Sequence, residues 1–211
     1  MVDIAVVDYG MGNLRSVYNA LRSVAPNASI EVTCTPSVVE QAGRVVFPGQ
    51  GAMPDCMREL DRMKLRSAVL YAAKNKPFLG ICIGLQMLFE HSTEGDVACL
   101  GVLPGEVVRF KHEMHDAQGD RLKVPHMGWN QITHRDHAMW QGIAQGERFY
   151  FVHSYYVQTK ESVLVQAESQ YPDAFVCAVA RDNLFAVQFH PEKSHTAGLQ
   201  LLKNFVSWNP V

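Results

Sequence analysis

The sequence predicts a single α/β domain over residues 1–211, with a mostly parallel, partly mixed central sheet and helices on both faces. Two observations carry this prediction. Strand and helix patterns alternate through the first half, whereas short strands separated by turns crowd the second half. The composition is 47% hydrophobic over 211 residues, which is enough to bury one core, and we find no repeat, linker or low-complexity tract.

The first half contains the alternating elements. The run DIAVVD at 3–8 is apolar as a strand is, and NLRSVYNALRSV at 13–24 spaces its apolar residues as a helix does. The patterns that follow predict a strand at 29–34, a short helix at 37–42, a buried strand at 44–47, a loop at 48–52, a helical region over about 55–75 with a break near Met63, a strand at 77–81 and a helix at 85–91. This alternation favours parallel strands covered on both faces.

The second half reads as shorter strands, several of them antiparallel. They are expected at 105–110, 122–124, 148–153, 163–168, 175–180 and 184–189, and a final helix is expected at 195–208. The segment 111–121 is polar and contains glycine, so it is the stretch for which we expect disorder.

Charge and cysteine content exclude several classes of protein. The net charge is −2, from 19 basic and 21 acidic residues without a basic stripe, so we expect neither a nucleic-acid nor a membrane partner. No apolar stretch approaches the roughly 18 residues that span a bilayer, and the N-terminus reads as a strand rather than a signal peptide. The five cysteines are odd in number and form no Cys-x-x-Cys pair, which favours a reducing cytoplasm.

The stretch GICIG places Cys82 between Gly80 and Gly84, where a strand becomes a helix. This is the pattern of a nucleophile elbow. A helix N-terminus favours thiolate over thiol, and the N–H of Ile83 can point at a developing oxyanion. The alternative is a buried core cysteine in a glycine-rich packing position.

The stretch QFHPE supplies a candidate base for that nucleophile. Pro191 biases His190 towards extended geometry, in which residues two apart face the same side. His190 and Glu192 can therefore act as the base and the group that orients it. The alternative is a histidine at a strand end paired with a surface glutamate.

The loop PGQGA carries Gly49 and Gly51 around Gln50. It follows a strand and could turn an N–H into the site as a second oxyanion donor. The alternative is an ordinary turn between a strand and a helix. Two His-x-x-His pairs, His112 with His115 and His134 with His137, lack a convincing third ligand, so no metal is expected.

PGQG, GICIGLQ and QFHPE together resemble the class I (triad) glutamine amidotransferases. The resemblance implies a type 1 amidotransferase domain of flavodoxin-like α/β fold that hydrolyses glutamine to glutamate and ammonia, without a cofactor. It implies that Cys82 is the nucleophile, His190 the acid–base and Glu192 its orienting group. It also implies that Gln86 contacts substrate and that N–H groups of Gly49, Gly51 and Ile83 form the oxyanion hole.

Three further stretches, DYGMGNLRSV, PHMGWN and YFVHSYY, resemble the glutaminase subunits of imidazole glycerol phosphate synthase, an enzyme of histidine biosynthesis. PHMGWN is the most specific, and Gln50 departs from the valine usual in these subunits. The resemblance implies that backbone groups of His153, Ser154 and Tyr155 hold glutamine. It also implies a heterodimer with a cyclase subunit of (β/α)8 barrel fold, which receives the ammonia and makes imidazole glycerol phosphate and an aminoimidazole carboxamide ribonucleotide. The residues expected to face the cyclase are Asn13, Arg15, Trp129 and Asn130.

Other functions stay open at this point. Another class I glutaminase, serving pyridoxal phosphate or anthranilate synthesis, would use the same chemistry, and PHMGWN argues against it. A cysteine peptidase or γ-glutamyl hydrolase would need no partner to accept ammonia. A dinucleotide-binding module is disfavoured because GMGNLR has Arg15 where the third glycine should be. For Trp129 the alternative is a core aromatic.

Overall fold

The first half of the chain alternates strands with helices, as predicted. The computed structural model describes residues 2–116 and 118–210. Its first eight elements are β1 (Ile4–Val7), α1 (Leu14–Val24), β2 (Ile30–Thr33), α2 (Pro36–Gln41), β3 (Arg44–Gly49), α3 (Met53–Arg62), α4 (Arg66–Asn75) and β4 (Phe78–Cys82). The predicted break near Met63 is confirmed, because the chain turns between α3 and α4 at Lys64, whose φ is +58°.

The second half is richer in strands than the sequence patterns predict. Its helices and strands are α5 (Ile83–Gln86), β5 (His91–Ser92), β6 (Val97–Ala98), β7 (Gly105–Arg109), β8 (Met114–His115), β9 (Arg121–Leu122), β10 (His126–Gln131), β11 (Thr133–His134), β12 (Arg148–His153), β13 (Tyr155–Thr159), β14 (Val165–Gln170), β15 (Ala174–Arg181), β16 (Leu184–Val187) and α6 (His195–Ser207). The strands without a counterpart in the sequence-based prediction are β5, β6, β8, β10, β11 and β13, of which β10 and β13 are the longest.

The helix predicted over 85–91 is wrong. Helix α5 begins at Ile83 and ends at Gln86. The carbonyl groups of the next three residues, 87–89, accept hydrogen bonds from the backbone N–H groups of residues 100–102, at 2.8–2.9 Å. These carbonyls are therefore not available to continue the helix, and the chain turns into β5 instead.

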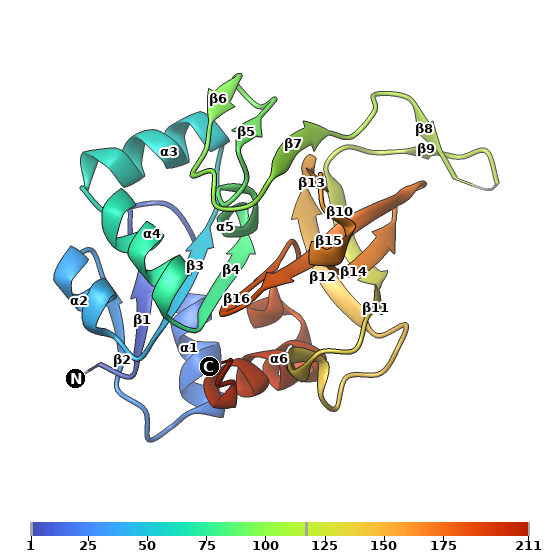
Figure 1. Ribbon diagram of the computed structural model, residues 1–211. Helices are drawn as coiled ribbons and strands as arrows, with labels where there is room; N and C mark the ends of the chain where they lie inside the picture. Colours follow the sequence, from blue (N-terminus) through green and yellow to red (C-terminus); the bar gives the residue numbers. More distant parts are fainter. Residues whose placement is uncertain (1, 117, 211) are drawn as a thin grey trace.

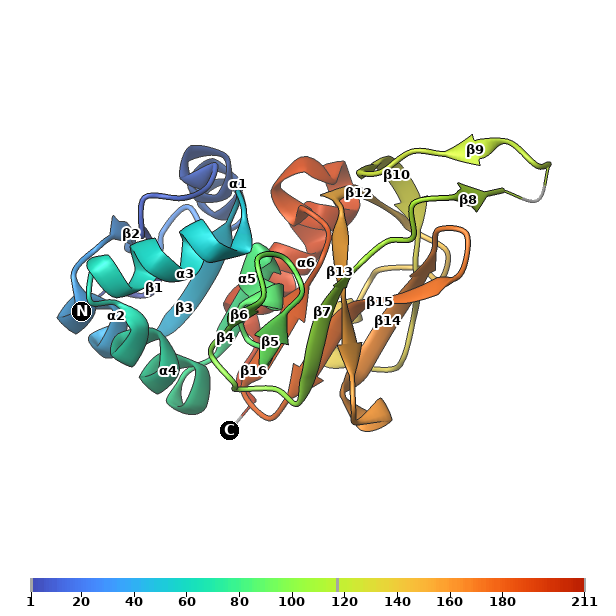
Figure 2. The same cartoon turned by 90° about the horizontal axis from the view of Figure 1, so that it is seen from above.

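The polar segment 111–121 is partly ordered rather than disordered. Its described residues include β8, which pairs antiparallel with β9 as a short hairpin. Residue 117 lies outside the described residues. Figures 1 and 2 show this hairpin projecting away from the central sheet.

The central sheet is mixed, and its two parts differ in direction. The strand order is β2-β1-β3-β4-β16-β15-β13-β7-β5-β6, with β14 paired to β15 and to β11. The first five strands are parallel to one another, and from β15 to β7 the neighbours are antiparallel. A separate antiparallel ribbon joins β10 to β12. The mixed sheet agrees with the predicted fold class.

Helices cover both faces of the parallel strands, so alternate side chains of one strand enter different cores. On β1, Ala5 and Val7 belong to the core under α2, α3 and α4, whereas Ile4 and Val6 belong to the core with α1 and α6. Figures 1 and 2 show the two helix layers. Strands buried on both faces are apolar throughout, which is why β1 reads IAVV.

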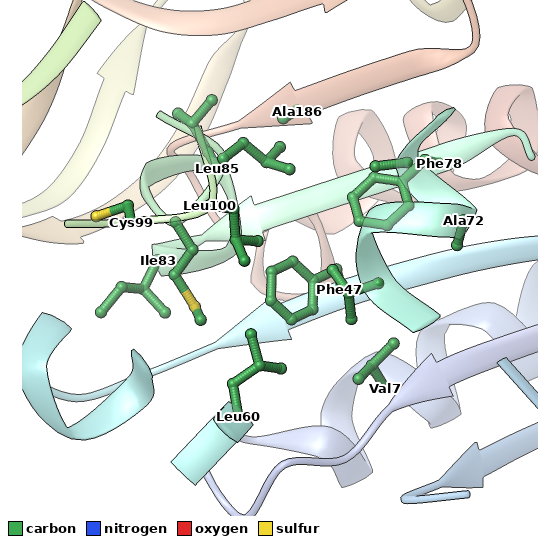
Figure 3. Packing of buried hydrophobic residues seen from close by; sticks show 14 of the residues in the cluster. Val7, Phe47, Leu60, Ala72, Phe78, Ile83, Leu85, Cys99, Leu100 and Ala186 are labelled. Carbon is green, nitrogen blue, oxygen red and sulfur yellow. The ribbon is translucent and has the colours of Figure 1, made fainter. Parts of the chain in front are cut away.

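The first of these cores also supports the turn at the end of β4. Figure 3 shows Ile83 and Leu85, which follow that strand, packed with Phe47 of β3 and with Leu100. Strands β3, β4 and β16 are parallel neighbours. Their carboxyl ends therefore meet at one edge of the sheet, which brings residues 49–51, Cys82 and residues 188–192 together.

Candidate active site

Cys82 ends β4 in a strained backbone conformation, with φ +56° and ψ −113°. For a residue with a Cβ such a conformation costs about 1–3 kcal/mol, and it persists where the surroundings enforce it. Gly84 shows the enforcement, because an added Cβ there would lie 1.9 Å from the carbonyl oxygen of Phe47. At Gly80 an added Cβ would lie 2.9 Å from the Cβ of Ala186. Close packing explains both glycines, but packing alone does not require the positive φ of the cysteine.

The helix after Cys82 is too short for its macrodipole to stabilise a thiolate strongly. Helix α5 has four residues, so few peptide dipoles are aligned behind the sulfur. The expectation that Cys82 lies at a helix N-terminus is confirmed, because Cys82 is the N-cap of α5, but the dipole of so short a helix is small. Any group that favours the thiolate must come largely from elsewhere in the fold.

His190 and Glu192 form a buried pair. The distance from His190 Nδ1 to Glu192 Oε1 is 2.8 Å, and the two side chains are only 6% and 1% exposed. His190 is extended, as expected, but Glu192 lies in the one-turn 3-10 helix Pro191–Lys193. The pairing is therefore made by a turn, not by the two faces of an extended segment.

The electrostatics of the pair favour an imidazolium. Burial lowers the pKa of His190, but the negative Cys82 sulfur and the Glu192 carboxylate together raise the pKa above its ordinary value. Because Nδ1 is bonded to Glu192 Oε1, Nε2 is the ring nitrogen that can exchange a proton with the sulfur or with a substrate atom.

Backbone contacts fix the imidazole from a second strand. The N–H of His190 donates to the carbonyl of Tyr150 on β12 at 2.9 Å. The hydroxyl of Ser194 donates to the carbonyl of His190 at 2.6 Å and accepts from the N–H of Tyr150 at 3.0 Å. Neither Tyr150 nor Ser194 was predicted from the sequence, although Ser194 lies four residues after the histidine.

Two buried amides link the sulfur to the opposite wall of the site. Gln188 Nε2 donates to Cys82 Sγ at 3.8 Å, and Gln86 Nε2 donates to Gln188 Oε1 at 2.9 Å. Gln86 Nε2 also donates to the carbonyl of Tyr155 at 3.0 Å. Gln188 was not singled out from the sequence, although it is the first residue of the QFHPE stretch.

The predicted oxyanion loop lies beside the elbow. Gly49 is the register partner of Cys82 across β3 and β4. An added Cβ at Gly49 would lie 1.9 Å from the Tyr9 hydroxyl, and Gly51 has a φ of +121°, so both positions require glycine. The thiol of Cys56 donates to the carbonyl of Gln50 at 3.7 Å, which fixes the loop between the two glycines.

A cavity of about 340 Å³ opens over the sulfur. Its volume lies within the range of sites that bind small molecules. Its walls bring together most of the predicted residues, namely Gly51, Cys82, Ile83, Gln86, His153, Ser154, Tyr155 and His190. Gly49 does not line it. The cavity adds Glu94 and Lys193, two charged residues that the sequence analysis did not identify.

The segment after β12 is held by two buried histidines. His153 Nδ1 bonds the carbonyl of Tyr155 at 2.8 Å, and His153 Nε2 lies 2.9 Å from His126 Nδ1. Burial lowers the pKa of His153 to about 3 and that of His126 to about 4. Both imidazoles are therefore neutral at neutral pH, and the pair fixes the backbone that lines the cavity.

The predicted partner-facing residues all lie at the surface or close to it. Asn13 caps α1 by accepting from the N–H of Ser16 at 3.4 Å, and Arg15 is exposed. Trp129 is 42% exposed and stacks on the ring of His195, which overturns the alternative of a core aromatic. Asn130 Nδ2 donates to the carbonyl of Gln170 and lies 3.2 Å from His126 Nε2.

Neither a metal cluster nor a membrane span is found over residues 2–116 and 118–210. No group of three or more His, Cys, Asp or Glu side chains is arranged there to hold a metal ion. No helix in that part of the chain has the length and apolarity to cross a membrane.

Comparison with known proteins places the chain in a family. It matches the class I glutamine amidotransferases over residues 5–208. It is 64% identical to the imidazole glycerol phosphate synthase subunit HisH of Thiobacillus denitrificans, over 99% of this chain and 92% of that protein. It is 65% identical to the subunit of the same name from Dechloromonas aromatica, over 98% and 97% of the two chains.

Solved structures agree on the fold. A structure described as a glutamine amidotransferase superposes with a TM-score of 0.71 at 18% identity, covering 97% of both chains. A second glutamine amidotransferase structure, from Thermotoga maritima, gives 0.60 at 18% identity, covering 90% of this chain and 76% of that one. The chain belongs to the class I glutamine amidotransferases and, among them, to the HisH subunits of imidazole glycerol phosphate synthase, as its PHMGWN and YFVHSYY stretches predict.

Proposed function

We propose that Cys82, His190 and Glu192 are the triad with which this chain hydrolyses glutamine. The observation that carries the proposal is the strained Cys82, held at the edge where the buried His190–Glu192 pair also lies. A cysteine that only filled the core would need neither the positive φ nor an imidazole whose pKa is raised by the sulfur. Membership of the HisH family makes the chain a glutamine amidotransferase subunit of histidine biosynthesis.

The proposed reaction proceeds through a thioester. The Cys82 thiolate attacks the side-chain amide carbon of glutamine, and the negative charge that develops on the carbonyl oxygen is stabilised by N–H groups of Gly51 and Ile83, the two predicted oxyanion residues that line the cavity. The His190 imidazolium gives its Nε2 proton to the departing ammonia. The neutral imidazole then takes a proton from water, which cleaves the thioester and releases glutamate. Glu192 holds the ring orientation throughout through its bond to Nδ1.

The cavity suggests how glutamine is oriented. Gln86, His153, Ser154 and Tyr155, the residues that the family resemblance assigns to glutamine, all line it. Glu94 and Lys193 place one negative and one positive group on its walls. A zwitterion buried in a cavity needs charged or polar partners. We therefore assign the α-amino and α-carboxylate groups of glutamine to these polar and charged lining residues.

We further propose that the whole length, 1–211, forms one amidotransferase domain that docks on a cyclase subunit of (β/α)8 barrel fold in the cytoplasm. Ammonia released into neutral water is mostly protonated, so the product is useful only if a partner covers the site and receives it. Asn13, Arg15, Trp129 and Asn130 are at or near the surface, as docking requires. We expect little glutamine hydrolysis by the lone chain, and full activity without the cyclase would contradict that expectation.

The triad is tested by Cys82→Ala in the complex with the cyclase. Glutamine-dependent product formation should fall at least about 1,000-fold, because removing a nucleophile abolishes the covalent route. Synthesis from added ammonia should persist, since the cyclase is intact. The matched control is Cys34→Ala, an exposed cysteine, which should leave both activities unchanged. Retained glutamine hydrolysis in Cys82→Ala would refute the assignment.

A further inference from the structure

The amide side chain of Gln188 is buried in a stretch whose other residues are apolar. Strand β16 reads LFAV with every residue buried, and the next residue, Gln188, is 0% exposed before the buried Phe189. Burying an amide costs free energy unless its polar atoms find partners, so an apolar side chain would be the default at this position. The partners of the Gln188 amide are therefore informative.

One of these partners is the catalytic sulfur. Gln188 Nε2 lies 3.8 Å from Cys82 Sγ and donates to it. The His190 imidazole also acts on the sulfur, since the negative charge of Cys82 raises the pKa of that imidazole. The sulfur is thus contacted by an amide that lies two residues before the catalytic histidine, in addition to the imidazole itself.

The orientation of the Gln188 amide is fixed by a second amide. Gln86 Nε2 has two N–H groups, and it donates them to the carbonyl of Tyr155 and to Gln188 Oε1, at 3.0 and 2.9 Å. Because a backbone carbonyl can only accept, Gln86 must present its nitrogen to both partners. Gln188 must then turn its oxygen to Gln86 and its nitrogen to the sulfur. The network leaves no room for the flipped amide.

An N–H aimed at sulfur favours the anion. A thiolate is a much stronger hydrogen-bond acceptor than a thiol, so the contact lowers the free energy of the reactive form. Helix α5, with four residues, cannot provide this stabilisation by its dipole. Each tenfold gain in thiolate population costs only about threefold in the reactivity of each thiolate, so the net effect at neutral pH is acceleration.

We propose that Gln188 is a catalytic residue, a hydrogen-bond donor that stabilises the Cys82 thiolate and aims it at the substrate carbon, with Gln86 fixing its orientation. This inference rests on the proposed role of Cys82 as nucleophile. When the sulfur lone pair forms the C–S bond, the sulfur becomes a neutral thioester atom and the N–H of Gln188 loses a charged acceptor. Gln188 therefore acts on the resting thiolate and its attack, not on the breakdown of the thioester.

The test measures the thiol directly. The complex with the cyclase is treated with iodoacetamide without glutamine from pH 5 to 10, and alkylation of the Cys82 peptide is followed by mass spectrometry. In Gln188→Leu the apparent pKa of the alkylation profile should rise by about one unit or more, because a hydrogen bond to a charged group is lost. Alkylation near neutral pH should fall several-fold, and kcat for glutamine should fall more than KM changes.

Two further variants separate this role from a structural one. Gln188→Glu keeps the shape of the side chain but replaces the donor by a carboxylate, so it should raise the alkylation pKa at least as much as Gln188→Leu. Gln166→Leu removes a half-buried amide of β14 away from the cavity and should leave the profile unchanged. If Gln188→Leu and Gln188→Glu fold and lose activity with an unshifted profile, Gln188 is only structural. If Cys82→Ala retains activity, the proposed function itself is wrong.

Discussion

The two halves of the central sheet contribute different things to the site. The parallel strands β3, β4 and β16 end at one edge and deliver the oxyanion loop, the nucleophile and the base from positions that lie far apart in the sequence. The strands beyond β15, with the ribbon of β10 and β12, deliver the wall that faces them. The positions of the reacting groups thus depend on tightly packed strand ends. The position of the facing wall depends on hydrogen bonds between neutral buried side chains.

The largest effect is expected at the tightly packed parallel edge. In Gly84→Ala the new methyl group would overlap the backbone carbonyl of Phe47, so β3 and the elbow must move apart. We expect a loss of about 3 kcal/mol or more in the free energy of unfolding, measured in urea, together with loss of glutamine hydrolysis. Gly101→Ala is the control, because nothing lies within 4 Å of its added Cβ and only its φ of +65° opposes the change, at about 1–2 kcal/mol. If the two variants had equal free energies of unfolding, the environment of Gly84 would not be more tightly packed than that of Gly101.

An intermediate effect is expected at the histidines of the facing wall. The folded-state pKa values of His126 and His153 lie near 4 and 3, below the ordinary value of about 6.5. The stability they contribute is therefore complete above pH about 6.5 and is lost as the pH falls towards 4, because the unfolded chain takes up protons first. Each contributes a slope of up to about 1.4 kcal/mol per pH unit over that window.

Urea denaturation between pH 7 and 4.5 measures this slope. His126→Gln should reduce the slope by the contribution of about one proton, whereas His115→Gln, at the exposed residue of β8, should not change the slope. An unchanged slope in His126→Gln would mean that the wall does not depend on a neutral imidazole at this position.

The smallest effect on the chain itself is expected at the outer strand β10. Trp129→Ala removes a side chain that is 42% exposed, so stability should change little. Affinity for the cyclase, measured by titration calorimetry, should fall about tenfold, as for an aromatic anchor at an interface. Tyr71→Ala on α4 is the matched control, because that aromatic is 47% exposed on another element. Equal affinities in both variants would place the interface elsewhere.

The sequence predicts the parts of the site that follow from strand ends. GICIG, QFHPE and PGQG are local patterns, and a parallel sheet brings the ends of its strands to one edge, so the fold class was enough to place them together. The helix over 85–91 was predicted wrongly, because the carbonyl groups at 87–89 are taken by backbone N–H groups more than ten residues further along the chain. Strands β10 and β13 were missed because their polar residues mask the alternation that marks a half-buried strand.

Short contiguous stretches of sequence were enough to identify the family, the fold class and the proposed triad residues, because each of these is encoded locally. How the sulfur is held became visible only in the folded chain. Gln188 meets Cys82 from 106 positions away and Gln86 from 102 positions away. The one-turn helix adds little to the stability of the thiolate, so that stability depends on the Gln188 amide and on the His190 imidazolium. A buried hydrogen bond depends on where two side chains lie in space, and spacing along the chain carries no record of it.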